Sequence, residues 1–123
     1  AQHKDKNNHY YIEDVEEWLP SKKYDIIFSM ETFYYFNNPN QIIDNIYNNL
    51  LNSNGIFIIG IDHYLENKQS LNWDKEYNLS TNTLSKNEWK NIFIKTGFKK
   101  ITLNLFGEKD NWGGTLIISG QKL

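Results

Sequence analysis

Residues 24–62 read YDIIFSMETFYYFNNPNQIIDNIYNNLLNSNGIFIIGID, and this stretch decides the fold. It opens with one apolar run, Tyr24 to Met30, and closes with another, Ile56 to Ile61. Neither run alternates polar and apolar residues, and both are rich in Ile, which is typical of strands buried on both faces of a parallel sheet. The two runs therefore predict two neighbouring parallel strands.

A helix is predicted between these strands, over Asn40–Leu51. Asn38 can cap it, and Pro39 suits its first position, where no backbone N–H is needed. Asn54-Gly55 predicts the turn that ends the helix and leads into the second strand. The apolar residues that form one face of a 3.6-residue period are Ile42, Ile43, Ile46, Tyr47, Leu50 and Leu51. The result is a β-α-β unit, which is expected to have a right-handed crossover.

Such a unit indicates where a ligand would bind. In open α/β sheets, ligands lie outside the carboxyl ends of the strands. These ends are Ser29-Met30-Glu31-Thr32 and Ile61-Asp62-His63-Tyr64. Periodicity alone would suit any α/β protein, so the function has to come from the residues at these ends.

Composition limits the class of protein. A length of 123 residues fits a single domain, 1–123, and 39% hydrophobic residues suffice for a packed core. The chain lacks the run of about 18 apolar residues that a membrane helix needs. A net charge of −2, with no basic cluster larger than Lys99-Lys100, argues against a nucleic acid as the main partner. The absence of Cys excludes a thiol nucleophile and fits a cytoplasmic location.

The C-terminal part predicts a helix followed by a β-hairpin. Ser85-Lys86-Asn87-Glu88 is a capping-box signature, and Gly97 suits the left-handed position that ends the helix. Residues 99–106 alternate between polar and apolar, and Thr115 to Ser119 form a further apolar run. The connector 107–114 carries turn residues, so these two strands are expected to pair antiparallel.

The order of these segments resembles that of the class I S-adenosylmethionine-dependent methyltransferases. The resemblance begins with the acidic strand end and Leu-Pro of IEDVEEWLP and continues through Tyr24-Asp25 and the aromatic segment that follows. The turn Leu51-Asn52-Ser53-Asn54-Gly55 and the final strand WGGTLIISGQK complete the pattern. The resemblance implies an α/β, Rossmann-like methyltransferase fold, present in part, whose parallel sheet ends in an antiparallel β-hairpin.

The resemblance also implies a cofactor, S-adenosylmethionine, and residues that would contact it. Asp14 would accept a hydrogen bond from the adenine amino group, and Val15 would pack on the ring. The methionine part would lie against Ser29, Met30 and Glu31, largely against the backbone.

Three residues are candidates for the reaction itself. The rings and hydroxyls of Tyr34 or Tyr35 could stabilise the positive charge of a sulfonium methyl donor. His63 could act as a general base, although a solvent-facing His at a strand end is an equal alternative. Trp73 and Tyr77 are the most plausible apolar walls of a pocket for a small-molecule acceptor.

The strongest motif of this family, a glycine-rich turn after the first strand, is not found in the chain. The Gly residues stand at positions 55, 60, 97, 107, 113, 114 and 120, and none opens a helix after an N-terminal strand. We therefore expect the C-terminal part of a methyltransferase, inactive by itself, whose Tyr24–Met30 strand forms an open edge and pairs with a second copy as a homodimer. Two alternatives are a non-catalytic methyltransferase-like partner subunit and an unrelated α/β module that binds a nucleotide or a protein.

Overall fold

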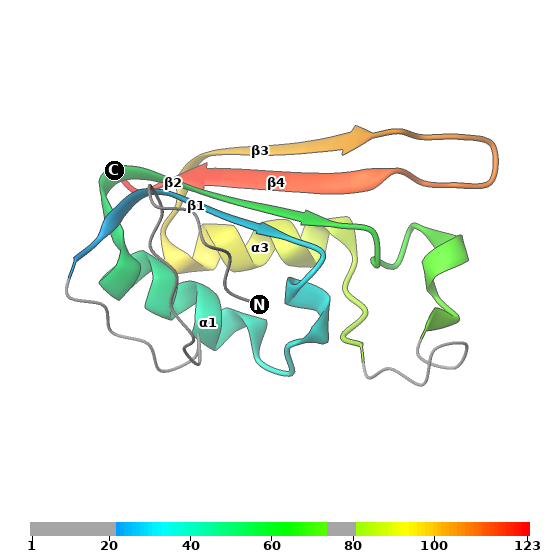
Figure 1. Cartoon of the computed structure of the whole chain (residues 1–123), viewed down its shortest axis with the longest axis horizontal. Helices are drawn as coiled ribbons and strands as arrows, with labels where there is room; N and C mark the ends of the chain where they lie inside the picture. The colour runs from blue at the N-terminus through cyan, green and yellow to red at the C-terminus, as the bar shows by residue number, and fades with distance from the viewer. Residues whose placement is uncertain (1–21, 74–80) are drawn as a thin grey trace, which may run out of the picture.

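In the part of the chain that the structure describes, a four-stranded mixed sheet carries two helices on one face (Figure 1). The computed structural model describes residues 22–73 and 81–123. The strands run in the order β1-β2-β4-β3 across the sheet. Their bounds are Tyr24–Met30 for β1, Leu51–Ile61 for β2, Lys99–Phe106 for β3 and Thr115–Gln121 for β4, and the main helices are α1 (Pro39–Asn45) and α3 (Lys86–Thr96).

The strand pairing confirms the predicted topology. β1 and β2 are parallel neighbours, with Ile27 opposite Phe57. β4 lies antiparallel to β2, with Ile118 opposite Ile59, and also antiparallel to β3. The fold is therefore the predicted β-α-β unit, extended by a C-terminal hairpin.

The first helix begins as predicted but ends differently. Pro39 occupies its first turn, and Asn38 stands at the N-cap, although the Asn38 side chain makes no capping bond and instead donates to Gln41 Oε1 at 3.1 Å. The helix continues beyond α1 as a π-helical turn over Ile46–Leu50. The chain enters β2 at Leu51, so the expected helix end at Leu51 is one residue too late.

The predicted turn at Asn54-Gly55 lies inside β2, and its left-handed residue is Asn54 (φ 68°) rather than Gly55. Gly55 is required for space, because a Cβ there would lie 2.7 Å from the carbonyl oxygen of Asn52. The helix end is instead capped from the far end of the chain. The ammonium group of Lys122 donates to the carbonyl oxygens of Tyr47 (2.6 Å) and Leu51 (3.2 Å).

The second helix has both predicted caps. The Ser85 hydroxyl accepts from the Glu88 N–H at 3.0 Å, and the Glu88 carboxylate accepts from the Ser85 N–H at the same distance. Gly97 ends the helix with φ 120°. Trp89 and Phe93 are fully buried on its inner face, and the Phe93 ring stacks on Phe57 of β2 at 5.5 Å.

The core lies between the sheet and the helices, and the opposite face of the sheet is apolar but open. On β1, Ile26, Phe28 and Met30 are 66%, 59% and 47% exposed. The expectation that β1 is buried on both faces is therefore wrong for the part of the chain described, because α1 and α3 cover the same side (Figure 1). Among the described residues β1 is one of the two outer strands of the sheet, as predicted, and β3 is the other. No helix within residues 22–73 and 81–123 is long and apolar enough to cross a lipid bilayer.

Candidate active site

Two carboxyl groups come together at the carboxyl ends of β1 and β2. The last pair of the parallel ladder is Met30 opposite Gly60, and the next N–H, that of Glu31, donates to the Gly60 carbonyl oxygen at 2.7 Å. This bond extends the ladder by one step and places Glu31 beside Asp62, which directly follows β2. The edge where they meet is the one at which open α/β sheets bind ligands.

Glu31 is held in an unusual state. Its φ of +56° lies in the left-handed region, which costs a residue other than Gly about 1–3 kcal/mol. Its Oε2 atom accepts a hydrogen bond from the Tyr34 hydroxyl at 2.9 Å, whereas its buried Oε1 atom has no hydrogen-bond partner of normal geometry among the described residues. Strain and an unpaired buried oxygen at one residue are typical of functional sites.

The pKa of Glu31 is shifted as well. Burial raises the pKa of its carboxyl group, the Tyr34 hydrogen bond opposes that rise, and the negative charge of Asp62 adds to it. Burial also raises the pKa of the Tyr34 hydroxyl, and the Glu31 carboxylate raises it further. Perturbed titratable groups at a ligand-binding edge indicate a candidate catalytic site.

Asp62 is fixed from two sides. Its Oδ1 atom accepts from the Thr115 hydroxyl of β4 at 2.6 Å, and its carbonyl oxygen accepts from the Asn67 side chain at 2.8 Å. Asn67 is buried and also accepts from the Gly113 N–H at 3.0 Å. The loop after β2 is thus tied to the start of β4, and the second carboxylate is held in place before any ligand arrives.

Aromatic rings form a wall beside the two carboxyl groups. The buried Tyr34 ring lies 4.5 Å from the ring of Tyr35, 5.5 Å from His63 and 6.0 Å from Trp73. Trp73 in turn stacks on Trp112 at 6.3 Å. Tyr35 is 42% exposed, so its ring is available to a ligand, whereas Tyr34 reaches the site through its hydroxyl.

The chain is similar to proteins of known family. Residues 1–97 match the family model described as methyltransferase domain. The chain belongs to the class I S-adenosylmethionine-dependent methyltransferases.

One curated methyltransferase and two solved structures illustrate the similarity. Malonyl-[acyl-carrier protein] O-methyltransferase 2 of Ilyobacter polytropus is 32% identical over 90 residues, which are 70% of this chain and 34% of that protein. A chain from the complex of the Haloferax volcanii Trm112 methyltransferase activator with a methyltransferase is 20% identical, with a TM-score of 0.76, over 91% of this chain and 60% of that one. PigF with S-adenosylhomocysteine is 21% identical, with a TM-score of 0.67, over 89% of this chain and 34% of the PigF chain.

The extent of these matches bears on what they imply. The chain spans about a third of the curated relative and 60% of the Haloferax complex chain. The two structural likenesses, both below 25% identity, show the shared Rossmann-like methyltransferase fold. The predicted fold and family are confirmed.

His63 lies away from solvent. Its Nδ1 atom lies 2.8 Å from the Ser70 carbonyl oxygen, which can only accept, so Nδ1 is the donor of that hydrogen bond. Its Nε2 atom forms a hydrogen bond with the Thr83 hydroxyl at 2.7 Å. Both ring nitrogens are therefore engaged by the protein, and the solvent-facing alternative is wrong. In this arrangement His63 orders the loop after β2, while its role as a general base stays a prediction.

The remaining predicted contacts are partly described. Ser29 is half-buried opposite Ile59, and the exposed Met30 side chain passes over Gly60, where a Cβ would clash with its sulfur. Asp14 and Val15 lie outside the described residues, as does Tyr77. The roles of all these residues toward the cofactor stay predictions.

Sequence reasoning missed Asp62 and Thr115 as site residues. Asp62 carried a usable signal, because it directly follows a buried strand that predicts the ligand edge. Thr115 carried none, since its partner stands 53 positions away in the sequence.

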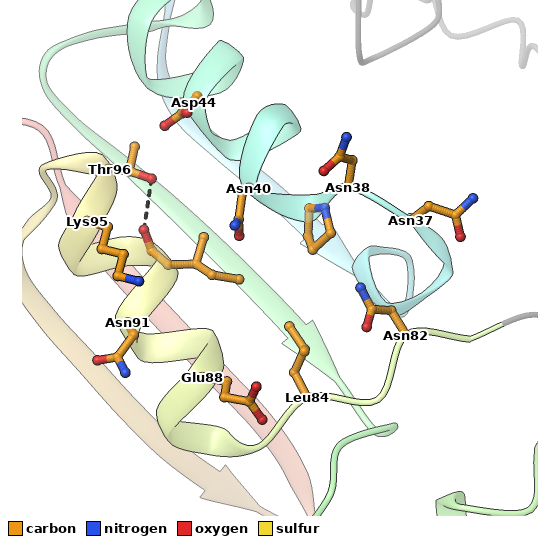
Figure 2. A pocket seen from close by; sticks show the side chains of 12 residues that line it. Asn37, Asn38, Asn40, Asp44, Asn82, Leu84, Glu88, Asn91, Lys95 and Thr96 are labelled. Atoms are coloured by element: carbon orange, nitrogen blue, oxygen red, sulfur yellow. Dashed lines mark hydrogen bonds between the residues drawn. The ribbon is translucent and has the colours of Figure 1, made fainter.

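A polar groove between α1 and α3 is a separate feature (Figure 2). It has a volume of about 450 Å³, and side chains from both helices line it, including Asn40, Asp44, Asn91 and Lys95. None of the site residues above lines this groove. It is therefore an alternative binding place that shares no lining residue with the carboxyl pair.

Proposed function

We propose that this chain supplies the acceptor-side part of an S-adenosylmethionine-dependent methyltransferase that acts on a small molecule at the carboxyl ends of β1 and β2. The observation that carries the proposal is the Glu31–Asp62 pair, which stands at the ligand edge and leaves one buried carboxylate oxygen without a hydrogen-bond partner of normal geometry among the described residues. An unpaired acceptor of this kind is satisfied when a ligand donates a hydrogen bond to it. These carboxylate oxygens therefore fit a ligand that carries N–H or O–H groups, which would donate hydrogen bonds to them.

S-adenosylmethionine, when bound, supplies a methyl group on a positively charged sulfur. Ser29, Met30 and Glu31 would hold its amino-acid part, and Asp14 with Val15 its adenine. The exposed face of Tyr35 would stabilise positive charge by about 0.5–2 kcal/mol.

Alignment of the reactants is the main catalytic demand of methyl transfer. The buried Tyr34 and His63 rings support the more accessible rings of Tyr35 and Trp73, which would give an acceptor an apolar surface. That support is rigid, because His63 is fixed through both nitrogens and Tyr34 through its hydroxyl. Glu31 would accept a proton from an acceptor that has one to lose, because its pKa is raised by burial.

The test is calorimetry with S-adenosylhomocysteine on the full-length protein. We expect Asp14→Ala to weaken binding by about 1–3 kcal/mol, the usual cost of removing one partner of a buried hydrogen bond. Asp44→Ala, on the exposed side of α1, is the matched control and should bind as the unmodified protein does. Equal affinity for all three proteins would refute the assignment of the adenine contact.

A second candidate function is a non-catalytic methyltransferase-like subunit that pairs with an active chain. The end position of β1 in the described sheet favours it, because an open strand edge recruits another strand. The same calorimetry discriminates the two functions. A full-length protein that shows no heat of binding with S-adenosylhomocysteine, yet stimulates a second methyltransferase chain, would establish the subunit role.

A further inference from the structure

We propose that the outer edge of β3, with the side of α3 next to it, is a docking surface for an extended acidic segment of a partner protein, which adds a strand to the sheet. This inference is independent of the proposed function, because it uses none of the residues at the carboxyl ends of β1 and β2. β4 pairs with one edge of β3, and no hydrogen bond between described residues occupies the other (Figure 1). The unpaired N–H and C=O groups of such an edge can bind another chain.

An apolar strip runs along this edge. Ile101, Leu103 and Leu105 of β3 pack against the core on the helix side of the sheet, and each keeps part of its surface exposed. Ile94 of α3 is 51% exposed. An added strand directs every second side chain to the helix side of the sheet, so its apolar side chains would cover this strip.

Lys90 and Ile94 bring α3 into the docking surface. They stand four positions apart and therefore share one stripe of the helix. Trp89 and Phe93 form the buried inner face, and neither Lys90 nor Ile94 lines the groove that α3 forms with α1 (Figure 2). Because α3 also packs against β3, the stripe of Lys90 and Ile94 lies on the β3 side of the helix.

Uncompensated positive charge surrounds the apolar strip. Lys90, Lys99 and Lys100 are exposed, and none of them forms an ion pair with another described residue. The net charge of the whole chain is −2, so this positive charge is a local feature. Carboxylates of a partner complement it, whereas a basic segment is repelled. A nucleic acid would match the charge but offers no side chains to cover the strip, which favours an acidic protein segment.

The irregular start of β3 sets the place of pairing. The β3–β4 register shifts between Lys99 and Thr102, and Lys100 has a φ of +50°. A bulge and lysines protect an edge from indiscriminate pairing, which leaves Thr102–Phe106 as the regular part. A partner strand would pair there antiparallel to β3 and place the carboxylates at its C-terminal end beside Lys99 and Lys100.

The test is amide NMR of the full-length protein titrated with three synthetic peptides. The first reads Val-Thr-Val-Thr-Val-Glu-Asp-Glu, the second ends in Lys-Asn-Lys instead, and the third is the first with Pro in place of its central Val. Proline removes a backbone donor and disfavours strand pairing. We expect the first peptide to shift the Thr102–Phe106 signals in a saturable manner and the others to bind about tenfold more weakly or less. No saturable shift, or equal affinity for the first peptide and either of the others, would overturn the proposal.

Variants test the contribution of the lysines. A double variant, Lys90→Gln with Lys99→Gln, should weaken binding of the first peptide about fivefold, as expected for the loss of two exposed ion pairs. Lys68→Gln, in the exposed loop after β2, is the matched control and should bind as the unmodified protein does. The amide spectrum reports the fold of each variant. Equal affinities for all three proteins would overturn the assignment of the acidic partner to this surface.

The same spectra distinguish two other occupants of the edge. A second copy of the chain would shift the Thr102–Phe106 signals as the protein alone is concentrated. A nucleic acid would be recognised by oligothymidylate that binds at Lys90 and Lys99 more tightly than the first peptide. We expect neither effect, and either one would overturn the proposal of an acidic protein segment.

Discussion

Replacing Glu31 by Gln should stabilise the protein at neutral pH while it damages the proposed site. Burial raises the pKa of Glu31 above its ordinary value of 4.5. Below pH 4.5 the carboxyl group is protonated in the folded and the unfolded chain alike, so it adds no pH dependence. Above pH 4.5 the unfolded chain loses this proton first, and stability falls until the folded group is ionised as well. Gln does not ionise, so the Glu31→Gln variant lacks this loss of stability.

The magnitude follows from the surroundings of the carboxylate. A buried polar atom without a partner costs about 1–3 kcal/mol. Because the Glu31 side chain is only half-buried and shares its charge with solvent, we expect the low end, about 1 kcal/mol at pH 7. For a domain of this size that gain raises the melting temperature by about 4 °C.

The assay is urea unfolding followed by Trp fluorescence across the acidic to neutral range, for the unmodified chain, Glu31→Gln and the exposed control Glu108→Gln. The stability difference between Glu31→Gln and the unmodified chain should grow as the pH rises from 4.5, and the control should show no such trend. A difference that is flat with pH, or a variant less stable at pH 7, would refute the claim that Glu31 is held back from ionising.

Three further outcomes are expected. Ile59→Ala should lower the free energy of unfolding by about 2–5 kcal/mol, because Ile59 is fully buried against the helices, and Ile58→Ala, on the open face of β2, should cost much less; equal losses in urea unfolding would contradict the assignment of faces. Ser85→Ala should lower the free energy of unfolding by about 1 kcal/mol in thermal unfolding, and Ser85→Asn should lower it much less, because Asn can also cap a helix. Equal stability of Ser85→Ala and the unmodified chain would contradict a stabilising role of the capping box. We propose that two copies pair through the free edge of β1, so Phe28→Lys should give a monomer in sedimentation where the unmodified chain gives a dimer; an unmodified chain that sediments as a monomer would exclude this interface.

Local patterns predicted most of the fold. The β-α-β unit, the box at Ser85 and Glu88, and the left-handed Gly97 depend on neighbours within a few residues, so the sequence itself carries them. The hairpin of β3 and β4 followed from alternation and turn residues in the same way.

Contacts between distant residues explain what could not be predicted. The turn expected at Gly55 moved into β2 because Lys122, from the last residues, pairs with this segment and caps the preceding helix. His63 is buried because Ser70 and Thr83 engage its ring, and neither partner is recognisable from spacing. An Ile- and Phe-rich run such as β1 reads the same whether one face or both are covered.

The central claim is that cofactor and acceptor meet at the carboxyl ends of β1 and β2. A crystal structure of the full-length protein with S-adenosylhomocysteine tests it most directly. We predict the homocysteine sulfur at the edge formed by Ser29–Glu31 and Asp62, with the Tyr35 ring beside it. Density for the ligand in the groove lined by Asn40, Asp44 and Asn91, with that edge left empty, would contradict the account.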